Sequence, residues 1–151
     1  MSLFEFVKDA GEKLFDRDKE AEKVMSDGDK AVALQMYVTK LGLPVQNLVV
    51  GYKAGTAEVH GIASTQADRE KAILAVGNAA GVERVDDRIR VEAPEPEATF
   101  YTVKSGDSLS KIAQTYYGDA KKYPDIFEAN KPMLNDPDRI YPGQVLRIPA
   151  R

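Results

Sequence analysis

The last third of the chain constrains the fold most, because its local signals all agree on one small module. Residues 101–104 have the composition of a short strand, and the Ser-Gly-Asp sequence that follows ends it and places Asp107 where it can cap a helix. The helix should end at Gly118, since glycine readily takes the left-handed conformation of a C-terminal cap. Its apolar stripe consists of Leu109, Ile112, Ala113, Tyr116 and Tyr117.

The remainder of this module returns to a second strand. A shorter helix can begin near Asp119, with Pro124 in its first turn, where proline is tolerated. Residues 141–144 have the Pro-Gly centre of a type II turn, and the apolar residues 145–148 follow as a strand antiparallel to the first. We therefore predict a β-α-α-β domain over residues 100–151.

Residues 1–92 predict a separate domain with an α-β-β-α-β order. Lys53-Ala54-Gly55 has the composition of a hairpin turn between two β-rich runs. The expected elements are a helix over residues 31–41, strands over 48–52 and 56–62, a helix capped by Ser64 or Thr65, and a strand over 82–91. Two helices would then cover one face of a small mixed sheet, so the whole chain belongs to the α+β class.

Two further segments complete the predicted organisation. Residues 93–99 are rich in Pro and Glu and read as an extended linker between the two domains. Residues 1–16 carry apolar side chains at helical spacing with acidic neighbours, which predicts a helix that docks on the protein's own core rather than on a membrane. These apolar residues are Leu3, Phe4, Val7, Ala10, Leu14 and Phe15.

Composition excludes several classes of function. The chain has no cysteine, one histidine and a net charge of −3, without a basic stripe, so thiol chemistry and nucleic-acid binding are not expected. The amino terminus lacks the features of a signal peptide and no stretch is long enough to span a bilayer, which predicts a cytoplasmic protein. No catalytic motif occurs, so we expect no enzyme, and Asp86 and Asp87 are interpreted as turn residues or solvated strand ends.

The carboxy-terminal module resembles a LysM domain. YTVKSGDSLSKIA at its front and IYPGQVLRIP at its end carry the resemblance, which covers residues 101–149. LysM domains bind glycans that contain N-acetylglucosamine, and the resemblance implies a groove between two loops. The residues that would line it are Gly106, Asp107, Ser108 and Leu109 in the first loop, and Ile140, Tyr141 and Pro142 in the second. The same residues are also ordinary turn and cap residues of such a fold, and that alternative stays open.

The sequence AEVHGIASTQADREKAILAVGNAAGVERVDDRIRV resembles a BON domain, over about residues 29–92. Together with the amino-terminal FVKDAGEKL, the whole chain resembles the family of cytoplasmic potassium-binding proteins that join one BON domain to one LysM domain. That resemblance implies a K⁺ receptor or sensor. We expect it to be a monomer, and we expect Rb⁺ or another large monovalent cation to substitute for K⁺. The alternatives are a glycan-binding module and a scaffold whose LysM domain binds another protein.

A K⁺ site would be made of main-chain oxygen atoms. Potassium is selected by neutral carbonyl dipoles, and the end of a helix offers carbonyls without intrahelical partners. The glycines of Gly77-Asn78-Ala79-Ala80-Gly81-Val82 allow the main chain to bend there. The predicted ligands are the carbonyls of Val7, Ala10, Gly77, Asn78, Ala79 and Val82. An ordinary glycine-capped helix end explains the turn more simply, and only the family resemblance favours the ion site.

Overall fold

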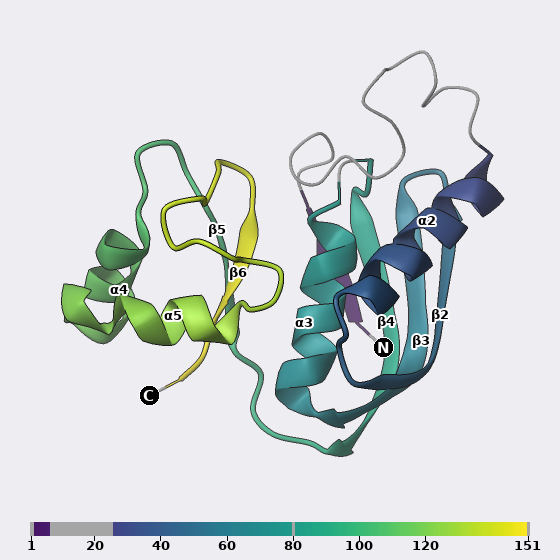
Figure 1. Cartoon of the computed structure of the whole chain (residues 1–151), viewed down its shortest axis with the longest axis horizontal. Helices are drawn as coiled ribbons and strands as arrows, with labels where there is room; N and C mark the ends of the chain where they lie inside the picture. Colours follow the sequence, from purple (N-terminus) through teal and green to yellow (C-terminus); the bar gives the residue numbers. More distant parts are fainter. Residues whose placement is uncertain (1, 7–25, 80, 151) are drawn as a thin grey trace.

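A computed structural model describes residues 2–6, 26–79 and 81–150 of the chain. The described residues form two units that lie side by side, each with helices packed on one face of a sheet (Figure 1). The first contains a sheet of four strands in the described ranges, and the second contains a sheet of two. Both domains therefore have the predicted α+β architecture.

The first domain has the predicted α-β-β-α-β order. Its elements are α2 (Asp27–Lys40), β2 (Val45–Lys53), β3 (Thr56–Thr65), α3 (Gln66–Gly77) and β4 (Arg84–Ala93), with β1 (Ser2–Glu5) before them. The strand order is β1-β4-β3-β2, in which β3 and β4 are parallel and the other neighbours are antiparallel. Helices α2 and α3 lie on the same side of this mixed sheet (Figure 1).

Local signals explain where these elements begin and end. Ser26 and Asp29 form a capping box at the start of α2, and the Thr65 side chain accepts a hydrogen bond from the Asp68 N–H at the start of α3. Between β2 and β3, Ala54 and Gly55 have φ angles of 48° and 86°. Two successive positive φ values are typical of the tight hairpin turn that matches the twist of the strands.

The predicted amino-terminal helix is wrong for its first residues. Residues 2–5 form β1, which pairs antiparallel with Arg84–Asp87 of β4. Helical and strand periodicity cannot be distinguished over only four residues. Here the segment forms a strand because its main chain pairs with the edge of β4. Phe4 packs on the core while Leu3 points outward and is 59% exposed. The rest of that prediction, with Val7, Ala10, Leu14 and Phe15, lies outside the described residues.

The second domain is the predicted β-α-α-β module. It consists of β5 (Thr99–Thr102), α4 (Leu109–Tyr117), the short 3₁₀ helix η1 (Ala120–Lys122), α5 (Tyr123–Ala129) and β6 (Val145–Ile148). Strands β5 and β6 are antiparallel, and Gly118 caps α4 with a φ of 73°. Gln144 N–H donates to the Tyr141 carbonyl and Gly143 has a φ of 91°, as expected for the type II turn.

Two details of this module differ from expectation. Ser108, not Asp107, caps α4, because its hydroxyl accepts from the Lys111 N–H. Tyr116 was expected on the buried stripe of α4, but it is 42% exposed and its ring packs edge-on against Tyr101. The buried stripe therefore consists of Leu109, Ile112 and Ala113, with Tyr117 partly buried against the same core.

Candidate functional site

The carboxyl end of α3 forms the turn that was expected to bind an ion. The helix ends at Gly77, and Asn78 N–H donates to the Leu74 carbonyl at 2.9 Å. Ala79 N–H then donates to Val76, and Gly81 takes a φ of 97° before the chain enters β4. We refer to residues 77–82, of which Ala80 is not described, as the α3 turn.

Several carbonyl groups of the α3 turn have no hydrogen-bond donor within the described part of the chain. The Ala79 carbonyl accepts from Val82 N–H, and the Gly81 carbonyl accepts from the Tyr52 hydroxyl. No hydrogen bond between described residues ends on the carbonyls of Gly77, Asn78 or Val82. Gly77 and Asn78 lie at the carboxyl end of α3, where the negative end of the helix dipole favours a cation.

The walls of the α3 turn are apolar. Ala79 and Val82 are both fully buried, as is Val76 one turn earlier. Within the ranges that the structure describes, no group of three or more His, Cys, Asp or Glu side chains is placed to hold a metal ion. What the described part of this turn offers a cation is neutral main-chain oxygen atoms, the type of ligand that suits a large monovalent ion.

The amino-terminal segment contacts the α3 turn through Phe6. Its N–H donates to the Glu83 carbonyl at 2.8 Å, which continues the pairing of β1 with β4. Its ring lies against Gly77 and fills the space that a Cβ atom would need. A glycine at position 77 thus allows Phe6 and the end of α3 to approach each other closely. Val7 and Ala10, the other predicted ligands, lie outside the described residues.

The interpretation of Asp87 as a solvated residue is wrong. Asp87 is 1% exposed on the inner face of β4, and its carboxylate forms a 2.6 Å ion pair with Arg69 of α3. Asp86, one residue earlier, points to the open face of the sheet and pairs with Arg88 at 3.1 Å. The alternation of a strand places the two neighbours on opposite faces, which the sequence pattern did not distinguish.

The side chain of Asn78 connects the α3 turn to the second domain. Its amide Nδ2 donates to the Val145 carbonyl and its Oδ1 accepts from the Val145 N–H, both at 2.8 Å. Asn78 therefore pairs with β6 as a neighbouring strand would. Sequence reasoning selected this residue for its carbonyl and missed the role of its side chain.

A second contact between the domains is made by Glu70 of α3. Its carboxylate accepts from Arg147 Nε of β6 at 2.9 Å, and from Gln66 Nε2 and Ala98 N–H at 3.0 Å each. Glu70 is 2% exposed and Arg147 is 8% exposed, so this ion pair is buried. The sequence contained one signal for it, because Glu70 stands at helical spacing with the buried Ile73, Leu74 and Gly77.

The predicted glycan-binding residues lie in two neighbouring regions of the second domain, one that joins β5 to the start of α4 and one in the loop before β6. Gly143 N–H donates to the Val103 carbonyl, which joins the loop before β6 to the end of β5. A Cβ on Gly106 would meet no atom within 4 Å, so the first loop is open. These residues differ in their surroundings. Leu109 is buried, Ser108 caps α4, and Ile140 is partly buried. Pro142 lies in the type II turn, and Tyr141 lines a cavity between the domains.

Asp107 has a structural partner in Tyr101. The Tyr101 hydroxyl donates to the Asp107 carboxylate, which also accepts from the Lys104 N–H. The bond from Tyr101 lowers the pKa of Asp107, with a smaller contribution from Lys104 N–H. The same bond raises the pKa of Tyr101 from 10.0 to about 12.

This pair predicts a pH dependence at both ends of the scale. The stabilisation from Tyr101 is complete below pH 10.0 and lost as the pH rises towards about 12, while that from Asp107 is lost as the pH falls through its lowered pKa. Ultraviolet titration of the 7 tyrosines should find one that ionises near pH 12. The Tyr101→Phe variant should lack the ionisation step near pH 12. The control variant Tyr123→Phe should retain it. Titration of all tyrosines near their ordinary pKa would contradict the pairing.

Comparison with known proteins agrees with this architecture. The sequence matches the BON domain over residues 29–93 and the LysM domain over residues 101–149. It is 48% identical over 155 aligned positions to the potassium binding protein Kbp of Escherichia coli, and the alignment covers 99% of each chain. The chain belongs to the Kbp family. The BON match thus covers the domain with the four-stranded sheet, and the LysM match covers the domain with the two-stranded sheet.

Two other relatives match only part of the chain. An uncharacterized protein of Deinococcus radiodurans is 59% identical over 52 residues, which is 34% of this chain and 20% of that protein. An esterase of Mycobacterium tuberculosis is 49% identical over 53 residues, which is 35% of this chain and 11% of the esterase. These short matches carry no information on activity. Within the described residues, no helix is long and apolar enough to cross a membrane.

Proposed function

We propose that this protein binds K⁺ as a cytoplasmic receptor, and that main-chain carbonyls at the end of α3 hold the ion. The observation that carries the proposal is the α3 turn, where carbonyls without donors among the described residues lie inside an apolar wall. The relative aligned over 99% of the chain is named a potassium binding protein, which supports the same ligand. Because that relative is a binding protein, we propose a binding role and no catalytic one.

The proposed ligands are the carbonyls of Gly77, Asn78, Ala79 and Val82, together with those of Val7 and Ala10. The Ala79 carbonyl already accepts one hydrogen bond, but a carbonyl oxygen has a second lone pair that can face an ion. Neutral dipoles replace the weakly held hydration shell of K⁺ at low cost, while a smaller cation would need the main chain to contract around it. Side chains contribute the apolar wall and no charge.

The proposal predicts an ion selectivity. Rb⁺ should substitute for K⁺ better than Na⁺ does, and Mg²⁺ should not compete, because it prefers charged oxygen ligands and keeps its water. Removing residues 1–12 should abolish K⁺ binding although few acidic groups are lost. Calorimetric titration of the full chain and of the truncated chain with each chloride salt measures both effects.

Asp86→Asn provides the matched control for that titration. This carboxylate lies in the same domain but faces the open side of the sheet, so its neutralisation should leave K⁺ affinity unchanged. Asp87 is unsuitable because its charge is buried against Arg69. Normal K⁺ binding by the truncated chain, or strong competition by Mg²⁺, would contradict the carbonyl site.

Glycan binding by the LysM domain is the second candidate function. The open position of Gly106 and the location of Tyr141 beside a cavity favour a test of the predicted groove. Chitin oligomers should shift the amide signals of both residues if the groove binds glycan. We expect weak binding or none, because the loop of residues 130–140 before the groove is long and charged.

A further inference from the structure

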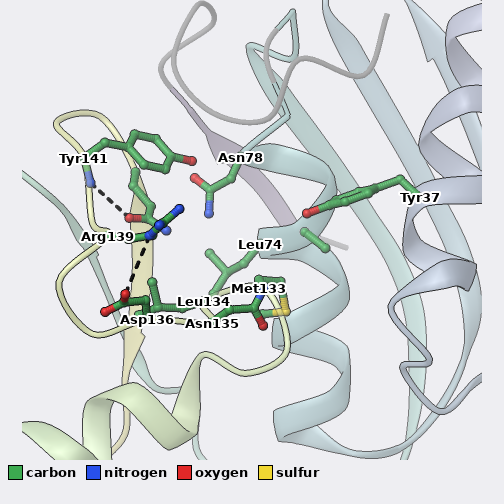
Figure 2. Close-up of a pocket in the computed structure, with 11 residues that line it drawn as sticks. Tyr37, Leu74, Asn78, Met133, Leu134, Asn135, Asp136, Arg139 and Tyr141 are labelled. Atoms are coloured by element: carbon green, nitrogen blue, oxygen red, sulfur yellow. Dashed lines mark hydrogen bonds and ion pairs between the residues drawn. The ribbon is translucent and has the colours of Figure 1, made fainter.

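A cavity of about 540 Å³ lies between the two domains. Figure 2 shows Tyr37 reaching in from α2 on one side, and Tyr141 and Arg139 from the second domain on the other. Leu74 of α3 and Leu134 of the loop before β6 form apolar parts of its lining, together with Met133. The cavity is therefore large enough for a small organic molecule and has one apolar side.

Gln144 places a hydrogen-bond donor at this cavity. The residue is only 6% exposed and lines the cavity. Its Oε1 accepts from the Tyr141 N–H at 3.3 Å, which fixes the orientation of the amide and leaves Nε2 as the donor. Among the described residues nothing accepts a hydrogen bond from Nε2, and it is not sealed from the cavity. Nε2 is therefore a donor that is open to the cavity and available to an acceptor on a ligand.

Arg139 supplies a positive charge beside this donor. Its Nε lies 3.6 Å from Asp136 Oδ2, which is too long for a hydrogen bond, and its side chain is 83% exposed. The guanidinium can therefore turn to a better acceptor at little cost. The amide of Asn78 is not available in the same way, because Val145 already uses both of its polar atoms.

We propose that this cavity binds a small organic carboxylate with an apolar body. The carboxylate accepts hydrogen bonds from Gln144 Nε2 and from the Arg139 guanidinium, and the apolar body lies on Leu74, Met133 and Leu134. Guanidinium and carboxylate form strong paired hydrogen bonds, and a bound carboxylate would displace Asp136 from its loose contact. The site uses side chains of both domains and lies beside Asn78, whose carbonyl is one of the proposed K⁺ ligands.

Titration of the full chain with 4-methylpentanoate tests the proposal, at fixed K⁺ concentration and ionic strength. The methyl signals of Leu74, Met133 and Leu134 should shift and saturate, with a Kd of about 1 mM for a ligand of this size. The neutral isostere 4-methylpentanamide should bind about tenfold more weakly. Equal binding of acid and amide, or no saturable shift up to about 20 mM, would overturn the proposal.

Variants separate the charged contact from simple apolar binding. Arg139→Gln should weaken binding of the acid about tenfold and leave the amide unchanged, whereas Arg90→Gln, on the open face of the sheet, should change neither. Asp136→Asn should strengthen binding of the acid, because it removes a competing carboxylate. Gln144→Glu keeps the acceptor for Tyr141 and should abolish binding of the acid. An acid affinity that is insensitive to Arg139→Gln, or that falls in Asp136→Asn, would contradict the assignment.

Discussion

Replacing Gly77 by alanine is expected to destabilise the first domain by about 1–3 kcal/mol, the usual cost of overpacking, and to weaken K⁺ binding about tenfold or more. The added Cβ would collide with the ring of Phe6, which lies directly against Gly77. Either the ring or the helix end must move, and both movements disturb the α3 turn. Urea unfolding followed by circular dichroism measures the stability, and calorimetry with KCl measures the affinity.

Gly51→Ala is the matched control for this substitution. Its added Cβ would meet only the Cβ of Glu58 at 4.0 Å, an ordinary contact, so both measurements should remain near the wild type. Gly77→Ala combined with Phe6→Ala should recover part of the stability, because the smaller side chain leaves room for the new methyl group. A single Gly77→Ala variant with unchanged stability would show that Phe6 does not pack there. Lost stability with unchanged K⁺ affinity would contradict the proposed ion site but not the packing of Phe6 on Gly77.

Replacing Glu70 by alanine is expected to lower the free energy of unfolding by about 3–5 kcal/mol, because it leaves Arg147 charged and buried without its partner. The Ala98 N–H and the Gln66 amide also lose the acceptor that holds them. The amide NMR signals of Ala98 and Val145 should shift strongly, since the contact between the domains depends on this carboxylate. Urea unfolding by circular dichroism gives the change in stability.

Glu58→Ala supplies the comparison for a surface carboxylate. Glu58 pairs with His60 and Arg88 on the open face of the sheet, where its side chain is 44% exposed, so the change should cost less than about 1 kcal/mol. Glu70→Leu with Arg147→Met removes both buried charges and should recover most of the loss. Equal effects of Glu70→Ala and Glu58→Ala would mean that the buried pair does not stabilise the fold.

Most elements of both domains could be predicted from the sequence, because local interactions decide them. The Thr65 cap, the hairpin turn at Ala54 and Gly55, the Gly118 cap and the type II turn at Gly143 each depend on a few adjacent residues. The periodicity of apolar residues then selected the buried faces. Local signals failed where they were shortest, at residues 2–5, and where one residue separates two faces, at Asp86 and Asp87.

The proposed sites depended on the tertiary structure for a physical reason. A carbonyl ligand carries no side-chain signature, so the α3 turn looks like any glycine-capped helix end until Phe6 and the buried Val82 are placed around it. The pairs Glu70 with Arg147 and Asn78 with Val145 join residues that are 77 and 67 positions apart. By itself the sequence determined the two folds and their order, since these follow from local propensity and periodicity. Only the tertiary structure decided which buried polar groups face each other across the domains, because that depends on packing between distant segments.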